Sequence, residues 1–338
     1  MSLSPIQFLQ DQFATLNVTP VSLAGKTIVV TGSNVGIGYG TVCHLIEMRP
    51  SRVILACRNM SKAEEAIRKI KMSTSTDGVV IEAQELNLAS FASCRAFAKR
   101  YQESGLPLHI LINNAGIGGV IKFTLTEDHH ESMFATNHLG TVLLTLLLLP
   151  VIRRTASMDD LTYPRIVIVA SEVHHWTQFS AKDTPSIVKT MDDATAPTKD
   201  RYQDTKLMNV LFTRSLARHL QESGHPEDRK ITVNVINPGL VSSELGKEDE
   251  SLLRRIGFAI FQSLLARNIA EGSKTTVYAA VAPECGVENG AQNGQYYSSC
   301  RAAEVNPIVE GEAGEELAER LWQETIETLE SRPHEFDI

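Results

Sequence analysis

The feature that most constrains the fold is an alternation of short runs rich in valine and isoleucine with longer helical stretches. The short runs predict strands at residues 27–30, 52–56, 79–86, 109–113, 165–170, 231–236 and 295–297. The helical stretches between them include residues 38–48, 61–72, 91–104, 127–149 and 202–221. Nearly continuous apolar strands are typical of a parallel sheet that helices cover on both faces. The alternation therefore predicts a doubly wound α/β fold, with a mostly parallel seven-stranded sheet in a single domain.

Some segments fall outside this alternation. A chain of 338 residues can still be one α/β domain with extensions. The expected division is an N-terminal arm at residues 1–22, the α/β domain at 23–300 and a C-terminal helical tail at 301–338. Residues 172–200 are polar and contain two prolines, which predicts a long loop on the substrate side. The apolar stretch 252–268, within an insertion at 245–272, is expected to be a lid, with an added core helix as the alternative.

Composition argues against several classes of protein. The net charge of −8, without a block of lysines and arginines, argues against a nucleic-acid partner. The five cysteines lie far apart, which indicates free thiols in a reducing compartment and no metal site. The N-terminus lacks the pattern of a secretory signal, and the most apolar stretch, 139–152, is too short to span a membrane. We therefore expect a cytoplasmic protein with no integral membrane segment.

The sequence TGSNVGIGYG at residues 31–40 joins the first predicted strand to the first predicted helix. A turn that brings backbone N–H groups and a helix N-terminus to an anion requires residues without a Cβ. Gly32 permits a tight turn, Gly36 lets the backbone approach a pyrophosphate, and Gly38 lets the helix pack closely. The spacing differs from the common G-x-G-x-x-G fingerprint, so a turn required only for packing stays open as an alternative.

The end of the second predicted strand bears on the choice of cofactor. In NAD-binding folds an acidic residue about twenty positions after the glycines holds the ribose 2′-hydroxyl. This chain has Cys57 and Arg58 there, and Lys62 adds a second positive charge. A guanidinium suits a 2′-phosphate because it can form charge-assisted hydrogen bonds with it. The pattern favours NADP(H) over NAD(H), with a solvated Arg58 as the alternative.

Tyr202 and Lys206 are four residues apart in a predicted helix and therefore lie on one face of it. A phenol with a pKa of about 10 is a poor acid at neutral pH, and a nearby ammonium favours its ionised form. Such a pair occurs in many helices by chance. However, the sequences NNAG at 113–116 and NPG at 237–239, together with Ser171, also follow predicted strands. The carboxyl ends of strands are where open α/β sheets bind ligands.

These motifs, taken in order, resemble the short-chain dehydrogenase/reductase family. They are TGxxxGIG at 31–38, NNAG at 113–116, NHLG at 137–140, a serine after the fifth strand, YxxxK at 202–206 and NPGxV at 237–241. The likeness runs from about residue 25 to residue 297. ACRNMSKAEEA, NHLGTVLLTLLL and the extended tail are most similar to the retinol-dehydrogenase-like and WW-domain-oxidoreductase-like branch, particularly its fungal members. The resemblance implies a Rossmann-type fold and NADP(H). For residues 143–149 it leaves two alternatives open, a homodimer interface or the core.

The resemblance also implies a role for each matching residue. Tyr202 would be the general acid in carbonyl reduction or the base in alcohol oxidation, while Lys206 would bind the nicotinamide ribose and lower the tyrosine pKa. Ser171 would orient the substrate oxygen, and Asn137 would hold a water of the proton relay. The implied cofactor contacts are Gly32, Ser33, Asn34, Gly36, Ile37, Gly38, Arg58, Lys62, Asn87, Leu88, Asn114, Ala115, Gly116, Tyr202, Lys206, Pro238, Gly239, Val241 and Ser243.

Three positions depart from the family pattern. The family usually has an aspartate after the third strand that bonds the adenine amino group, and this chain has Asn87, whose amide carbonyl can still accept that bond. Where many relatives have two serines, this chain has Ala170 and then Ser171, which leaves one candidate serine. Ser171 and Tyr202 are 31 positions apart, far more than in the family, which indicates an insertion that shapes the substrate pocket.

Two further patterns are assigned no chemistry of their own. His174 and His175 are adjacent on a predicted loop with no third ligand evident, so substrate contact or loop packing is expected rather than a metal. Ser243 followed by Glu244 is typical of a helix start, so helix capping is the alternative to cofactor contact.

The expected function is an NADP(H)-dependent interconversion of a ketone or aldehyde and an alcohol, on a bulky apolar metabolite. A fungal-type ketoreductase of secondary metabolism would suit these features. One alternative is a reaction at another bond with the same cofactor, such as imine reduction or epimerisation. Another is a non-catalytic NADP(H)-binding regulatory protein, although such proteins typically lose the tyrosine or the lysine, and this chain has both.

Overall fold

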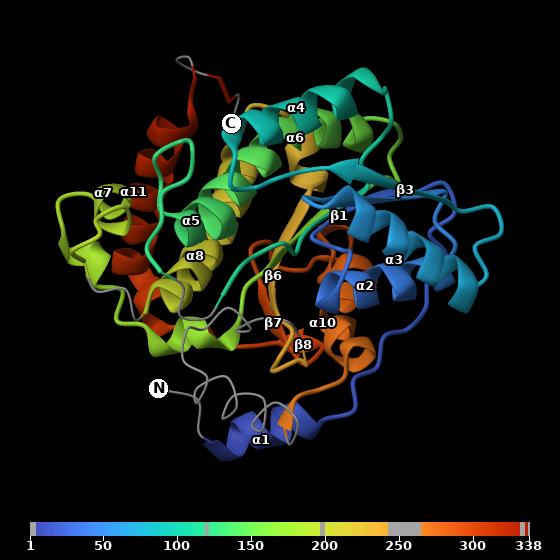
Figure 1. Cartoon of the computed structure of the whole chain (residues 1–338), viewed down its shortest axis with the longest axis horizontal. Coiled ribbons are helices and arrows are strands. Elements are labelled where there is room, and N and C mark those ends of the chain that lie inside the picture. The colour runs from blue at the N-terminus through green and yellow to red at the C-terminus, as the bar shows by residue number, and fades with distance from the viewer. Residues whose placement is uncertain (1–4, 119–121, 197–199, 243–264, 332–334, 337–338) are drawn as a thin grey trace.

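The computed structural model describes residues 5–118, 122–196, 200–242, 265–331 and 335–336, and it centres on one sheet in the order β3-β2-β1-β4-β5-β6-β7-β8 (Figure 1). The strands are β1 Thr27–Thr31, β2 Arg52–Cys57, β3 Val80–Glu85, β4 Ile110–Asn113, β5 Arg165–Val169, β6 Thr232–Asn237, β7 Tyr296–Ser298 and β8 Arg301–Ala302. All neighbours up to β7 pair in parallel, and β8 pairs with β7 antiparallel. The doubly wound, mostly parallel fold is confirmed.

The predicted number of seven strands was wrong, because the two-residue strand β8 adds an eighth. It forms a tight hairpin with β7 through Ser299 and Cys300, whose φ angles are 52° and 55°. Two-residue hairpin turns of this kind favour Asn and Gly, because those residues tolerate positive φ. Ser-Cys is not such a pair, so the sequence carried no turn signal at this point.

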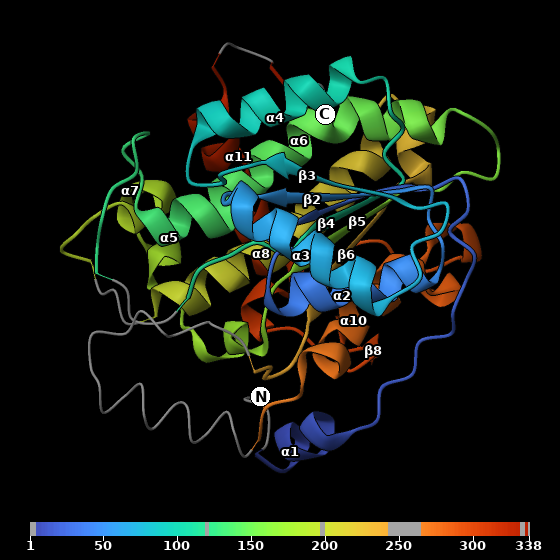
Figure 2. The ribbon, with the colours of Figure 1, turned by 45° about the vertical axis from the view of Figure 1, so that its right-hand side comes forward.

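Helices cover both faces of the sheet, and each face has its own apolar cluster. One cluster joins α2 (Gly36–Glu47), α3 (Met60–Ser73) and α10 (Ile269–Val281) to the strands. The other joins α4 (Phe91–Glu103), α6 (Gly140–Ala156) and α8 (Arg201–Glu222) to the opposite face. Figure 2 shows α4 and α6 on one side of the strands and α2 and α10 on the other. Because neighbouring side chains in a strand point to opposite faces, Val29 belongs to the second cluster and Val30 to the first.

The helix predicted at 127–149 begins later and is interrupted by a wider turn. It consists of α5 (Ser132–Phe134), a π-helical turn η1 (Ala135–Leu139) and then α6. Within the described residues, Ser132–Ala156 is the one helix long and apolar enough to cross a membrane, but 83% of its most apolar window is buried inside the protein. The sequence interpretation as a buried helix agrees with this placement.

Residues 172–196 contain more structure than the loop predicted for 172–200. They contain the short helical turns η2 (Glu172–Trp176) and η3 (Ser180–Asp183) and the helix α7 (Ile187–Met191). Apolar side chains, including those of Phe179 and Met191, are buried against the core. These elements are too short to show a helical period, so a polar sequence with two prolines was misread as a plain loop.

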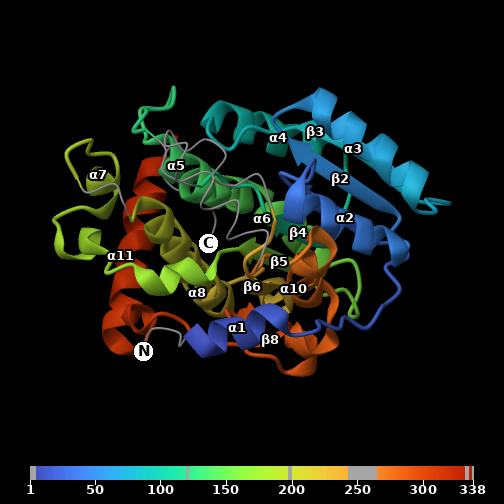
Figure 3. The ribbon, with the colours of Figure 1, turned by 60° about the horizontal axis from the view of Figure 1, so that its bottom comes forward.

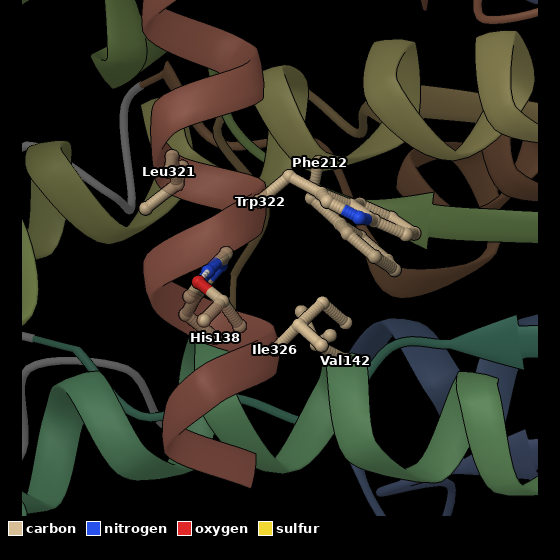
Figure 4. A pocket seen from close by; sticks show the side chains of 7 residues that line it. His138, Val142, Phe212, Leu321, Trp322 and Ile326 are labelled. Atoms are coloured by element: carbon tan, nitrogen blue, oxygen red, sulfur yellow. Dashed lines mark hydrogen bonds between the residues drawn. The ribbon is translucent and has the colours of Figure 1, made fainter. Parts of the chain in front are cut away.

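The C-terminal tail belongs to the apolar cluster that includes α4, α6 and α8. Helix α11 (Gly311–Leu329) packs against α8. The indole of Trp322 stacks on His219 at 4.3 Å and on Phe212 at 5.8 Å between ring centres, and Figure 4 shows the latter pair beside His138 and Val142. Around residues 143–149, Leu143, Leu144, Leu148 and Leu149 are buried within this core.

Candidate active site

The motifs singled out in the sequence gather at one edge of the sheet. The glycine turn follows β1, Asn114 follows β4, Ser171 lies just beyond the end of β5 and Pro238 follows β6. These four strands are parallel and occupy adjacent places in the centre of the sheet, so their carboxyl ends meet. This edge is the usual ligand-binding side of a doubly wound sheet.

The glycine turn after β1 requires its glycines on steric grounds. Gly32 and Gly36 both have φ of 61°, a region that other residues rarely adopt. A Cβ on Gly32 would lie 2.8 Å from the Cα of Ala115. A Cβ on Gly38 would lie 2.5 Å from Nδ2 of Asn114. The turn can therefore pack against the end of β4 only because these side chains are absent.

The N-terminus of α2 offers hydrogen-bond donors to an anion. The helix begins at Gly36, and the preceding Val35 provides no side-chain cap. The first N–H groups of a helix have no partner within the helix, and the helix dipole adds positive potential there. The hydroxyl of Ser33 turns inward and donates to the carbonyl of Val30 at 2.8 Å, while Asn34 and Ile37 stay partly exposed at the turn. This arrangement fits the pyrophosphate of a dinucleotide.

Arg58 and Lys62 lie at the start of α3, exposed and close to the glycine turn in the fold. Among the described residues, no carboxylate lies within salt-bridge distance of either side chain, and the nearby Glu65 pairs with Lys69 at 2.7 Å. Cys57 is buried beneath the turn, 3.9 Å from the Ser33 hydroxyl. Two cations that form no salt bridge in the described part of the chain, and a β2 that ends without a carboxylate, fit a ribose that carries a 2′-phosphate.

The loop after β3 offers a cofactor fewer free groups than the family resemblance implies. The side-chain oxygen of Asn87 accepts a hydrogen bond from the backbone N–H of Ala89 at 3.2 Å, so one of its lone pairs is already used. The side chain of Leu88 is buried in the core, which leaves only its backbone for a cofactor. Asn87 keeps a second lone pair for a donor such as an adenine amino group.

Hydrogen bonds tie the end of β4 to the glycine turn. The N–H groups of Asn114 and Ala115 both donate to the Thr31 hydroxyl at 2.9 Å, and the Asn114 amide donates to the carbonyl of Thr31 at 2.9 Å. Gly116 follows directly. A Cβ there would lie 3.0 Å from Oδ1 of Asn137 and 3.5 Å from Nζ of Lys206. Gly116 therefore connects the predicted cofactor turn to the predicted catalytic side chains.

The structure brings together the four residues predicted to be catalytic. Tyr202 and Lys206 lie on α8, with Nζ of Lys206 5.6 Å from the centre of the tyrosine ring. The Ser171 hydroxyl acts on the Tyr202 phenol and lowers its pKa. Lys206 donates to the carbonyl of Val169 at 2.9 Å, at the end of β5. One edge of the sheet therefore brings together the phenol of Tyr202, the hydroxyl of Ser171 and the ammonium of Lys206.

Asn137 lies in the π-helical turn η1 rather than in a regular helix. Its side chain bonds both backbone groups of Ile117: Oδ1 accepts from the N–H and Nδ2 donates to the carbonyl, each at 2.8 Å. Nδ2 also donates to the Thr205 hydroxyl at 3.1 Å, next to Lys206. Insertions of a π turn are frequent at functional sites because they redirect one side chain.

The pKa values at the site differ from what the sequence suggests. Burial raises the pKa of Tyr202 to about 12, although part of its side chain faces solvent, and the Ser171 hydroxyl opposes the rise. Burial lowers the pKa of Lys206 to about 8. The sequence predicted that Lys206 would lower the tyrosine pKa, but in this structure desolvation dominates and Ser171 supplies the lowering effect.

The loop after β6 places Pro238 and Gly239 at the same edge. The side-chain oxygen of Asn237 accepts the N–H of Gly239 at 2.9 Å. The side chain of Val241 is buried against Gly272 of α10, and a Cβ on Gly272 would lie 2.3 Å from Cγ2 of Val241. Val241 can therefore offer a ligand only its backbone. The prediction for Ser243, like most of the proposed lid at 245–272, lies outside the described residues.

Sequence reasoning missed three side chains at this edge. Burial raises the pKa of Glu172, directly after Ser171, to about 7, and the Asn237 side chain opposes the rise. Gln12 and Arg267 are both buried against the loop after β6. No local pattern marks them, because they come from segments far apart in the chain. His174 is buried, with its ring 4.9 Å from that of Tyr296, which is a packing role.

Comparison with known proteins places these features in a family. A family model described as short chain dehydrogenase matches residues 26–182. The short chain dehydrogenase/reductase dmxR8 of Cryptosporiopsis sp. (strain 8999) is 35% identical over 331 residues, covering 96% of this chain and 97% of that protein. Human retinol dehydrogenase 12 is 35% identical over 92% of this chain and 88% of its own length. The NADP complex of RhlG from Pseudomonas aeruginosa has a similar fold, with a TM-score of 0.57 and 22% identity over 82% of this chain and 96% of that one.

Proposed function

The chain belongs to the short-chain dehydrogenase/reductase family, and we propose that it interconverts a ketone or aldehyde and an alcohol with NADP(H) as cofactor. The observation that carries this proposal is the meeting of Ser171, Tyr202 and Lys206 at the carboxyl ends of the central strands. Asn137 reaches the same group through Thr205. A protein that only bound the dinucleotide would have no need of this set.

Two groups of residues at this edge of the sheet would each hold one half of the cofactor. The turn at Gly32 and the N-terminus of α2 would hold the pyrophosphate, and Arg58 with Lys62 would hold the 2′-phosphate. Gly116, Pro238 and Gly239 would border the nicotinamide half. When bound, the nicotinamide supplies or accepts the hydride.

Side chains on α8 and just after β5 would donate or accept the proton. A phenol with a pKa of about 12 keeps its proton at neutral pH, so Tyr202 is in the form that donates to a carbonyl oxygen during reduction. The Ser171 hydroxyl, which lowers the pKa of this phenol, can orient the same substrate oxygen. Lys206 adds positive charge beside the developing phenolate, which stabilises it electrostatically. Asn137 fixes the position of Ile117 and bonds Thr205 next to the lysine.

A bulky apolar metabolite is the substrate class that we propose. Trp176, five residues after Ser171, exposes 56% of its surface. Exposed large apolar side chains near a site suit an apolar ligand. One relative is named for retinol, an apolar alcohol, and the fungal relative is consistent with secondary metabolism as the setting.

The test is Tyr202→Phe, which removes only the hydroxyl. A panel of ketones, aldehydes and alcohols is first screened on the wild type by NADPH absorbance. With a substrate found there, kcat should fall by about 10²- to 10⁴-fold in the variant, the usual contribution of a general acid. NADPH affinity should stay within about twofold, since the ring remains. Tyr163→Phe, in a partly exposed tyrosine of another loop, is the matched control and should keep full activity. Near wild-type turnover in Tyr202→Phe would contradict the assignment.

A further inference from the structure

Helix α1 (Pro5–Phe13) contacts the active-site edge although it precedes the first strand by many residues. Figure 3 shows it beside α10 and β8. The chain after it continues along α10, where the N–H of Leu16 donates to Glu271 at 2.7 Å and Lys274 donates to the carbonyl of Leu16 at 2.8 Å. The N-terminal arm is therefore attached to the domain by specific bonds.

Gln12, in the last turn of α1, is the centre of this attachment. Gln12 is 4% exposed, and its amide group makes three hydrogen bonds to backbone groups of Leu240, in the loop after β6, and of Leu265. Nε2 donates to the carbonyls of Leu240 at 2.6 Å and Leu265 at 2.8 Å. Oε1 accepts the N–H of Leu240 at 3.1 Å. Both amide protons are thus used on main-chain oxygens.

Arg267 completes the contact from the opposite side. Its buried guanidinium donates through Nε to the carbonyl of Gln12 at 3.1 Å and through Nη1 to that of Pro238 at 3.4 Å. Nη2 donates to the Ser299 hydroxyl at 3.1 Å and to the carbonyl of Asp11. One side chain therefore joins α1, the loop after β6 and the turn between β7 and β8.

The side chains of Gln12 and Arg267 both pack against Gly239, the glycine of the NPG motif. A Cβ on Gly239 would lie 3.0 Å from Nη1 of Arg267 and 3.1 Å from Oε1 of Gln12. The backbone of the loop is paired further with Arg267, whose N–H donates to the carbonyl of Leu240 at 2.8 Å. Pro238 and Gly239 are thus held between the end of β6, Arg267 and α1.

We propose that Gln12 is a positioning residue that sets the place of Pro238 and Gly239 and thereby the affinity for the nicotinamide half of the cofactor. This inference rests on the proposed function. Gln12 would not touch the reacting atoms, and the proposed contacts of the adenosine half, Arg58 and Lys62, lie around the start of α3. Removing its amide takes the hydrogen-bond partner from the N–H of Leu240 and from the carbonyl of Leu265, both half-buried, and frees the loop to shift, while the Leu240 carbonyl keeps the N–H of Arg267.

The experiment compares two ligands by isothermal titration on the full-length protein. One is NADPH, and the other is adenosine 2′,5′-bisphosphate, which lacks the nicotinamide half. Gln12→Ala should weaken NADPH by about tenfold, the loss expected for one to two net hydrogen bonds, and leave the bisphosphate within about twofold. Gln12→Met, which keeps the apolar volume, should show the same split and guards against misfolding of the smaller variant. Gln10→Ala, on the exposed side of α1, should change neither affinity.

The outcomes separate this inference from the function on which it rests. Equal losses for the two ligands, or no loss of NADPH affinity in Gln12→Met, would overturn the positioning role. A wild-type protein that binds neither ligand would overturn the proposed cofactor as well. A tenfold loss confined to NADPH, with thermal unfolding close to that of the wild type, would support the inference.

Discussion

Replacing Arg58 by alanine is expected to weaken NADPH binding by about 10- to 30-fold and to change NADH binding by less than about twofold. The two dinucleotides differ only in the 2′-phosphate, so the ratio of the two effects isolates that group. Arg58 is exposed and, in the described part of the chain, pairs with no carboxylate. The substitution therefore removes no interaction that the folded protein needs.

The size of the effect follows from the position of the side chain. A hydrogen bond to a charged group contributes about 1.5–3 kcal/mol, and exposure moves the value toward the lower end because water and salt screen the charge. Lys62 remains in the first turn of α3 and keeps part of the attraction. About 1.5–2 kcal/mol is thus lost, which corresponds to 10- to 30-fold in affinity.

The assay is a titration of each dinucleotide at low and high salt. NADPH affinity of the wild type should fall as salt rises, and Arg58→Ala should fall less steeply, because one screened contact is gone. Arg68→Ala, an exposed arginine further along α3, removes the same charge away from the site and should leave both affinities unchanged. Equal weakening of NADPH and NADH by Arg58→Ala, or tighter binding of NADH than NADPH by the wild type, would refute the reasoning.

Two further predictions concern buried charges. The pKa of Lys206 is lowered to about 8, so between pH 8 and 10 the unfolded chain binds more protons than the folded one, and stability rises with pH. Tyr202, whose pKa is raised, opposes this trend only above about pH 10. From pH 8 to 10 the wild type should therefore gain about 2 kcal/mol in free energy of unfolding relative to Lys206→Met, and equal slopes in urea titrations would contradict this. Asp228→Ala removes two bonds of 2.7 Å from the buried Arg153 and should cost about 3–5 kcal/mol by urea unfolding, against less than about 1 kcal/mol for the exposed Asp160→Ala.

Much of the fold was predictable because its signals are local. Strands such as β2 and β6 are nearly continuous apolar runs, and the long helices between them show their period within one helix. The turn after β1 was predictable from Gly32, Gly36 and Gly38, whose missing side chains the packing requires. Helix α7 and strand β8 were not, because two to five residues are too few to show a period.

The candidate site was predictable as a set of residue types in a known order. Ser171, Tyr202 and Lys206 come together because parallel strands place their carboxyl ends side by side. The electrostatics of the set were not predictable. Spacing predicted that Lys206 acts on the phenol, but it gave no sign that burial raises the pKa of Tyr202 or that Ser171 lowers it.

The sequence by itself determined the doubly wound sheet and the glycine turn, because each depends on neighbours within a few turns of the chain, and the order of its motifs pointed to the family. Only the tertiary structure decided which distant side chains support the site. Gln12 bonds Leu240 across 228 positions, and Arg267 bonds Gln12 across 255. Contacts of that separation leave no periodic trace in a sequence, since they depend on where the folded strands and helices place the chain.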